Sequence, residues 1–110
     1  MIFCAPVTSE DMIDPRWGRA DWVALADVVD GEIMSWQVVE VSWSRLHDEG
    51  GPGSHHARVV TFLRDHDVEA VVVDHMGDGM VRMLDTMQLP VHSGAAGDAR
   101  AAVKAASLKP

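Results

Sequence analysis

Hydrophobic residues along the first forty positions follow the patterns of β-strands. Residues 2–7 and 22–29 form two apolar runs, and residues 32–41 alternate roughly between apolar and polar side chains. Asp30-Gly31 separates the second run from the third. This dipeptide favours a type I′ turn, because both central positions of that turn need positive φ. The first part of the chain therefore predicts three strands in an antiparallel meander.

The rest of the chain alternates between helical and strand patterns. A loop is expected over residues 44–54, which include Gly50-Gly51-Pro52-Gly53. Ser54 and Asp98 are the expected N-caps of two helices, because a short polar side chain there accepts a hydrogen bond from the first turn. The predicted elements are a helix over residues 55–66, a strand over residues 68–74, a helix that Gly77-Asp78-Gly79 opens, a strand over residues 89–92, and a last helix over residues 98–108.

This order of elements predicts an α/β fold. The three-strand antiparallel meander is followed by two parallel β-α units, whose crossovers are right-handed almost without exception. Packing the helices on both faces of one mixed five-stranded sheet buries every apolar stripe. A length of 110 residues fits a single domain over residues 1–110.

Composition excludes several classes of function. The formal charge is −8, from 17 acidic and 9 basic residues, and the basic residues are scattered. Binding to nucleic acid or to an anionic membrane is therefore not expected, because both need clustered Lys and Arg. With Cys4 as its one cysteine the chain forms no intrachain disulfide, which fits a reducing compartment. The first residues do not resemble a signal peptide, and no apolar run is long enough for a membrane span, so a cytoplasmic protein is expected.

Four local features point to a known family. The chain opens with an Ile-Phe-Cys-Ala-Pro-Val strand, and Arg16-Trp17-Gly18-Arg19-Ala20 stands where the family carries His-Phe-Gly-Arg-Ala. Asp30-Gly31-Glu32-Ile33 matches the family's hairpin, and Val71-Val72-Val73 leads to Gly77-Asp78-Gly79. Over nearly its whole length the chain resembles the dinitrogenase iron–molybdenum cofactor-binding family, which includes NifX-like proteins and the C-terminal domain of NifB-like proteins. The resemblance implies a ribonuclease-H-like fold.

The same resemblance implies a non-enzymatic carrier of an iron–molybdenum or iron–sulfur cofactor or its precursor. Its partners would be the metallocofactor and cluster-assembly proteins. The implied cofactor-binding residues are Arg16, Trp17, Gly18, Arg19, Gly77 and Gly79. Arg16 replaces the family's His, and a guanidinium is not a metal ligand. Arg16 and Arg19 are instead expected to contact an anionic cluster through charge-assisted hydrogen bonds.

Histidines supply candidate metal ligands. His75 and His92 fall at or near the carboxyl ends of the two parallel strands, where ligands bind in open α/β sheets. His55 opens the helix that leads into the first of these strands, and neutral imidazole suits iron, zinc and copper. These three residues are the predicted metal ligands. Taken singly, each histidine is also compatible with an ordinary surface role, which is the interpretation for His47 and His66.

Other residue types are interpreted as structural. Cys4 is expected in the core, and the set Met76, Met80, Met83 and Met87 is expected in the core and on the helix surface. Gly77-Asp78-Gly79 is interpreted as a simple turn in preference to an anion-binding site. Trp17 is a candidate lid or contact residue. Catalysis has little support, because the first strand carries no acid for a ribonuclease-H-type nuclease.

Two alternatives to the carrier remain open. One is a small-anion or protein-interaction module that keeps the fold without a cluster, and a weaker one is a mononuclear zinc or iron site with hydrolytic activity. The long outer strand over residues 32–41 also offers an edge that a homodimer would cover.

Overall fold

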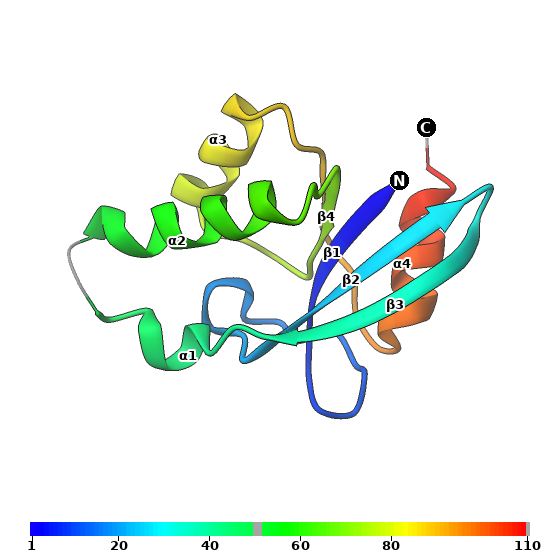
Figure 1. The fold of residues 1–110 in the computed structure, drawn as a ribbon, viewed down its shortest axis with the longest axis horizontal. Helices are drawn as coiled ribbons and strands as arrows, with labels where there is room; N and C mark the ends of the chain where they lie inside the picture. The colour runs from blue at the N-terminus through cyan, green and yellow to red at the C-terminus, as the bar shows by residue number, and fades with distance from the viewer. Residues whose placement is uncertain (50–51, 110) are drawn as a thin grey trace.

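The computed structural model describes residues 1–49 and 52–109, and within them five strands form one mixed sheet flanked by helices (Figure 1). The strands are β1 (Ile2–Val7), β2 (Trp22–Val29), β3 (Glu32–Glu40), β4 (Ala70–Val72) and β5 (Val91–His92). The helices are the 3₁₀-helix η1 (Trp17–Arg19), α1 (Trp43–Leu46), α2 (Pro52–Asp65), α3 (Asp78–Thr86) and α4 (Ala99–Ser107).

The sheet has the strand order β3-β2-β1-β4-β5. β1 pairs antiparallel with β2, and β2 with β3, whereas β4 is parallel to both β1 and β5. The predicted fold class, an antiparallel meander followed by two parallel β-α units, is confirmed. The hairpin turn has the predicted geometry as well, with φ of 52° at Asp30 and 79° at Gly31.

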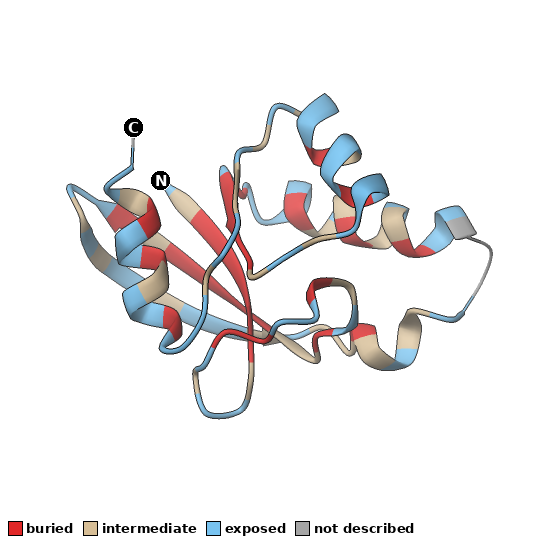
Figure 2. Cartoon of the chain, turned by 180° about the vertical axis from the view of Figure 1, so that it is seen from behind, coloured by how far each residue is buried: buried red, intermediate tan, exposed pale blue. Residues whose placement is uncertain are grey.

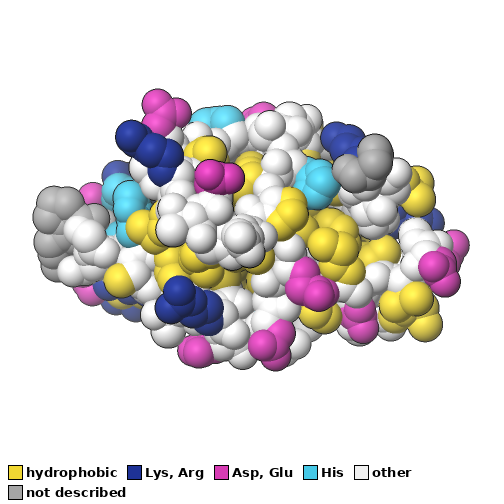
Figure 3. Space-filling view, turned by 90° about the horizontal axis from the view of Figure 1, so that it is seen from above, with side chains coloured by type: hydrophobic (Ala, Val, Ile, Leu, Met, Phe, Trp, Pro, Cys, Tyr) yellow, Lys and Arg dark blue, Asp and Glu magenta, His cyan; other side chains and the backbone are white. Residues whose placement is uncertain are grey.

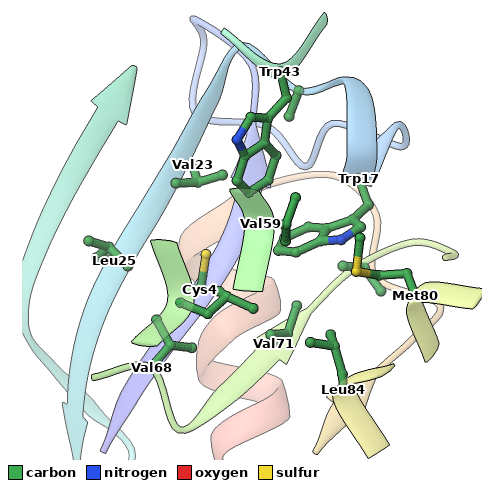
Figure 4. Close-up of a cluster of buried hydrophobic side chains, with 13 residues drawn as sticks. Cys4, Trp17, Val23, Leu25, Trp43, Val59, Val68, Val71, Met80 and Leu84 are labelled. Atoms are coloured by element: carbon green, nitrogen blue, oxygen red, sulfur yellow. The ribbon is translucent and has the colours of Figure 1, made fainter. Parts of the chain in front are cut away.

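Alternating residues of the central strands supply two separate cores. Figure 2 shows that buried residues concentrate on the strands at the centre of the fold. Cys4 of β1 and Val71 of β4 pack against Val59 of α2 and Leu84 of α3 on one face (Figure 4). The neighbouring positions, such as Phe3, pack on the other face with α4. Because successive strand residues point to opposite sides, near-continuous apolar runs fill both cores at once. The expected covering of both faces by helices is thereby confirmed.

Two short elements, η1 and α1, were not expected from the sequence. The loop predicted over residues 44–54 overlaps α1, whose first residue, the buried Trp43, donates a backbone hydrogen bond from its N–H to the Ala20 carbonyl at 2.9 Å. α2 begins at Pro52, so the prediction of Ser54 as its N-cap was wrong, and Ser54 lies within the first turn. Proline suits a first helical position, because its fixed φ is helical and the missing N–H has no partner there anyway. Gly50 and Gly51 lie outside the described residues.

The last helix begins as predicted, and the parallel strands are shorter than expected. Asp98 is the N-cap of α4, and its side chain accepts a hydrogen bond from the Ala101 N–H at 2.8 Å. β4 and β5 cover only part of the strand predictions at residues 68–74 and 89–92, because β4 is bonded to β1 and β5 over two residue pairs each. The flanking Val68 and Val73 are nevertheless buried.

β3 lies at one end of the strand order and carries exposed hydrophobic side chains at Met34 and Val38. The homodimer expected at this edge stays a prediction. On the face shown in Figure 3, basic and acidic side chains are interspersed, with hydrophobic side chains between them. Within residues 1–49 and 52–109, no helix is long and apolar enough to cross a membrane.

Candidate functional site

A cleft of about 380 Å³ opens between η1, the N-terminal part of α2, and the segment that connects β4 to α3. This segment follows the carboxyl end of a parallel strand, where α/β proteins place their ligand sites. The lining residues are Arg16, Trp17, Gly18, Arg19, His47, His55, His56, His75, Met76, Gly77, Gly79 and Met80. The cleft thus combines two guanidinium groups, four imidazoles and two thioethers.

The buried carboxylate of Asp14 holds Arg16 at the start of η1, which forms one wall of the cleft. It accepts hydrogen bonds from the backbone N–H of Arg16 at 2.9 Å, from Nε at 3.1 Å and from a terminal guanidinium nitrogen at 3.0 Å. The hydrogen bond and charge of Asp14 raise the pKa of Arg16 above its ordinary value. One side of the guanidinium is therefore held by Asp14, while Arg16 as a whole stays exposed and lines the cleft.

Aromatic rings hold η1 against the helices. Trp17 meets Trp43 edge to face with ring centroids 5.2 Å apart, and Trp43 makes similar contacts with His55 at 6.2 Å and Phe62 at 5.8 Å. Both tryptophans are almost fully buried. Trp17 is therefore a packed wall of the cleft, and its role as a lid or contact residue stays a prediction.

His55 of α2 makes hydrogen bonds through both of its ring nitrogens, and one of these bonds reaches η1. Nε2 lies 2.8 Å from the Gly18 carbonyl oxygen, so it carries the proton and donates, while Nδ1 accepts from the Arg58 guanidinium at 3.0 Å. Burial, together with the positive charge of Arg58, lowers the pKa of His55 below its ordinary value despite the bond to Gly18. His55 is thus a neutral structural link, and neither nitrogen is free for a metal ion in this arrangement.

His47 and Asp48 complete this side of the cleft. The His47 ring lies 4.8 Å from the His55 ring, and its Nδ1 is 3.1 Å from a carboxylate oxygen of Asp48. The Arg19 guanidinium approaches the same carboxylate at 3.5 Å. The hydrogen bond from His47 and the charge of Arg19 lower the pKa of Asp48. Arg19 is consequently held near the cleft by a solvated ion pair, which leaves it able to turn toward a ligand.

The N-terminus of α3 forms the opposite wall. Gly77 is its N-cap and makes no side-chain capping bond, so the first amides of the helix are not satisfied by that residue. Gly79 faces α2 closely, since a Cβ atom at this position would lie 3.3 Å from Cε1 of His56. His75 precedes this turn with 76% of its side chain exposed, and its Nδ1 is 3.7 Å from an Asp74 oxygen.

The structure brings most of the predicted site residues together. Eight of them line this one cleft: Arg16, Trp17, Gly18, Arg19, His55, His75, Gly77 and Gly79. The role of these residues in binding stays a prediction. In the part of the chain that is described, no group of three or more His, Cys, Asp or Glu side chains is arranged to hold a metal ion.

His92 does not join the other histidines, so the expected convergence was wrong for this residue. His92 pairs with Val72, which belongs to the core under α4, and its ring lies 6.2 Å from Phe3 on that face. It lines a second hollow of about 220 Å³ with residues of α4 and residues 93–96. A strand places successive side chains on opposite faces, and its carboxyl end alone does not decide which face a residue takes.

Sequence reasoning missed four residues of the cleft: His47, His56, Met76 and Met80. His47 was interpreted as a surface loop residue, because nothing in the sequence pattern indicates α1, which ends beside the cleft. The adjacent pair His55-His56 was the available signal for His56, and both members indeed face the cleft. Met80 was expected in the core, where it also lies.

The fold and sequence of known proteins extend these observations. A sequence model of the family described as "Dinitrogenase iron-molybdenum cofactor" matches residues 1–108. A comparison with curated proteins gives no significant match.

Among solved structures, the chain is similar to three of the same fold. PH0822 is 20% identical, with a TM-score of 0.75, and the match covers 96% of this chain and 88% of that one. A Thermotoga protein of the DUF35 family is 24% identical, with a TM-score of 0.70 and coverage of 96% of this chain and 86% of that one. The apo form of the orange protein from Desulfovibrio gigas is 18% identical, with a TM-score of 0.75 and coverage of 94% of this chain and 83% of that one. At these identities the likeness shows a common fold.

Proposed function

This chain belongs to the dinitrogenase iron–molybdenum cofactor family, and we propose that it is a non-enzymatic carrier whose cargo is an anionic metallocofactor of that class or an iron–sulfur precursor. The observation that supports this proposal most is the composition of the cleft between η1 and α3. Arg16 and Arg19 stand on one wall, and the uncapped N-terminus of α3 stands on the other. Guanidinium groups and helix N-terminal amides both favour an anion.

His75 is the proposed metal ligand. It is the one exposed imidazole among the four in the cleft, with 76% of its side chain accessible, whereas His55 is occupied by its hydrogen bonds and His92 lies on the other face. Imidazole nitrogen binds iron readily. A carrier has to release its cargo, and one imidazole combined with ionic contacts suits reversible binding better than a closed set of ligands.

The exposed cleft also suits transfer between proteins. A cluster held at the mouth by Arg16, Arg19 and His75 remains accessible to a receiving protein, so we propose cluster-assembly proteins as partners. The buried Cys4 thiol, whose pKa burial raises strongly, is not a ligand in this proposal. Iron–sulfur cargo and a single free cysteine are both consistent with the reducing cytoplasm.

Uptake of the cargo tests the proposal. The protein is incubated without air with iron–molybdenum cofactor, and separately with an iron–sulfur precursor, then separated by gel filtration and analysed for absorbance and metal content. We expect bound metal near one equivalent of cofactor, reduced about tenfold or more in Arg16→Gln, Arg19→Gln and His75→Ala variants, since a charged hydrogen bond contributes about 1.5–3 kcal/mol.

A matched control keeps the test specific. Arg64→Gln and Arg82→Gln each remove one positive charge, as Arg16→Gln and Arg19→Gln do, at exposed positions outside the cleft, and these two variants should bind like the wild type. Thermal unfolding identifies any variant that fails to fold, which matters for Arg16 because its removal leaves the buried Asp14 carboxylate unpaired. Wild-type protein that never acquires the cofactor's absorbance would refute the carrier.

One observation favours the alternative of a small-anion or interaction module. Arg16 stands at the position of the family's His, and its guanidinium already binds a carboxylate in a bidentate manner. A site with this chemistry recognises an oxyanion without any metal ligand. Binding of simple anions together with no uptake of any cluster would decide for this alternative.

A further inference from the structure

The two ring nitrogens of His47, one of the imidazoles that line the cleft, have different surroundings. Nδ1 lies 3.1 Å from a carboxylate oxygen of Asp48. An ionised carboxylate only accepts hydrogen bonds, so Nδ1 carries a proton and donates it. In the neutral ring the lone pair is therefore on Nε2, which makes no hydrogen bond with any group in residues 1–49 and 52–109. His47 thus has an unused nitrogen lone pair of the kind that binds iron, nickel and zinc.

The edge of the ring that carries this lone pair lies on the side of the cleft. A Cβ atom at Gly18 would lie 3.8 Å from Cδ2 of His47, and Cδ2 is the ring carbon that is bonded to Nε2. Gly18 and His47 both line the cleft, and 36% of the His47 side chain is exposed. The ring also packs beside the His55 ring, with centroids 4.8 Å apart. Nε2 is therefore on the edge that faces η1 and the cleft, while Nδ1 is occupied by Asp48.

The contact with Asp48 is the one that metal-binding histidines usually make. Such a histidine donates its second N–H to a carboxylate or a carbonyl, which fixes the tautomer and the orientation of the ring. The Asp48 oxygen that accepts from His47 also lies 3.5 Å from the Arg19 guanidinium. One carboxylate therefore holds both a candidate metal ligand and a cation at the cleft. His55 differs, because both of its nitrogens are used in hydrogen bonds within the protein.

We propose that Nε2 of His47 binds a metal atom of the cargo, and that Asp48 is the positioning residue that orients its ring. This inference rests on the proposed carrier function, to which it adds a second imidazole beside that of His75. Within the described part of the chain, no group of three or more His, Cys, Asp or Glu side chains is arranged to hold a metal ion. The cargo's own ligands fill the other positions around its metal atoms, so a pair of imidazoles is compatible with release.

A titration with Ni²⁺ tests the site with the metal alone. Small amounts of Ni²⁺ are added to protein purified without a histidine tag, and the ring signals of all six histidines are followed by NMR, because the paramagnetic ion broadens signals close to it. We expect the His47 ring to broaden at a lower Ni²⁺ concentration than that of His66, an exposed histidine outside the cleft. Broadening of His66 before His47 or together with it would overturn the proposed site.

Two acidic neighbours separate the positioning role from a general effect of charge. Asp48→Ala should need about tenfold more Ni²⁺ for the same broadening of His47, because an orienting carboxylate contributes a factor of that order to metal affinity. Glu49 follows Asp48 in the chain and pairs with Arg45 at 3.6 Å. Glu49→Ala removes the same charge and should respond to Ni²⁺ like the wild type. An unchanged response in Asp48→Ala would show that this carboxylate does not position the ring.

Uptake of an iron–sulfur precursor without air distinguishes this inference from the carrier function. His47→Ala should take up about tenfold less than the wild type, since losing a ligand costs at least as much as losing its orienting partner. His66→Ala should match the wild type. Full uptake by His47→Ala would overturn His47 as a ligand of the cargo and leave the carrier intact. Ni²⁺ binding at His47 in a wild type that takes up no cluster would refute the carrier and support a metal site of another use.

The titration of the wild type does not depend on whether a variant folds. Thermal unfolding checks His47→Ala and Asp48→Ala before their uptake is compared.

Discussion

His55 links α2 to η1 as a neutral imidazole. Its Nε2–H donates to the Gly18 carbonyl, and its Nδ1 accepts from Arg58. Protonation would place a cation beside the Arg58 guanidinium and near the rings of His47 and His56, and it would convert the accepting nitrogen into a donor. Protonation therefore removes the hydrogen bond that Nδ1 accepts from Arg58, while the bond that Nε2–H donates to Gly18 is retained.

The stability of the protein is expected to fall as the pH drops below neutral, in part through His55. Its pKa is lowered in the folded state, so the unfolded chain, with a pKa of about 6.5, binds the proton more readily. The stabilisation is present above about pH 6.5 and is lost as the pH falls from there through the folded-state pKa. Urea unfolding at a series of pH values, on the wild type and on His55→Gln, measures this dependence.

The matched control is His75→Gln, at a side chain that is 76% exposed. We expect His55→Gln to be less stable than the wild type near neutral pH and to lose part of the acid dependence, whereas His75→Gln should keep both properties of the wild type. An identical pH profile in the wild type and His55→Gln would show that His55 does not carry this dependence.

At the scale of elements, the approach of α2 to α3 sets the width of the cleft. Gly77 and Gly79 both belong to the wall formed by α3, but a methyl group at Gly77 meets nothing within 4 Å, whereas one at Gly79 lies 3.3 Å from the His56 ring. Neither residue has a positive φ, so alanine is compatible with both backbone conformations.

We therefore predict that Gly79→Ala weakens cofactor uptake by about tenfold, because an overpacked contact costs on the order of 1 kcal/mol or more. The helix itself tolerates the change, since alanine favours a helix over glycine by up to about 1 kcal/mol. Gly77→Ala should bind like the wild type. Uptake and urea unfolding measured on both variants separate the two effects, and equal uptake by both would mean that the width of this gap does not matter.

The β2–β3 hairpin gives a test of the fold that does not involve the cleft. Gly31 has a φ of 79°, and a Cβ atom there would lie 3.0 Å from Cδ2 of Leu108. Gly31→Ala should lower the free energy of unfolding by about 1–2 kcal/mol, the cost of a left-handed conformation for a residue with a side chain. Urea denaturation checks this, with Gly53→Ala in α2 as the control that changes stability by no more than about 1 kcal/mol in the stabilising direction.

The spacing of apolar residues predicted the principal elements, because the signals that define each of them lie close together in the sequence. The apolar runs that became β1 and β2, the Asp30-Gly31 turn and the Asp98 cap all act within a few residues. The elements that sequence reasoning missed, η1 and α1, are held instead by contacts between distant segments. Trp43 docks through its N–H on Ala20 and through its ring on Trp17 and Phe62, and a four-residue helix leaves no periodic signal.

At the scale of the whole molecule, the sheet separates two surfaces that the sequence does not distinguish. The β4–α3 connection leads to the cleft, and the segment after β5 leads to the hollow beside α4. The family resemblance was sufficient to predict that residues 16–19 lie near Gly77 and Gly79, and the topology was sufficient to predict that His75 lies at the same end of the sheet. The topology was not sufficient to place His92, because a shift of one residue in the strand moves its side chain to the other face of the sheet. It also did not identify His55 as a structural link, because the hydrogen bond of its ring to Gly18 joins segments that are far apart in the sequence.

Mapping the bound cargo on the molecule tests the central claim most directly, because it asks where the cofactor binds as well as whether it binds. Amide signals of the ¹⁵N-labelled protein are recorded without air before and after addition of the paramagnetic cofactor, which broadens nearby signals. We predict broadening at residues 16–19, 55–56 and 75–80, with residues 92–96 and α4 retaining their intensity. Broadening centred on the α4 face, or none at all, would contradict a carrier that uses the cleft between η1 and α3.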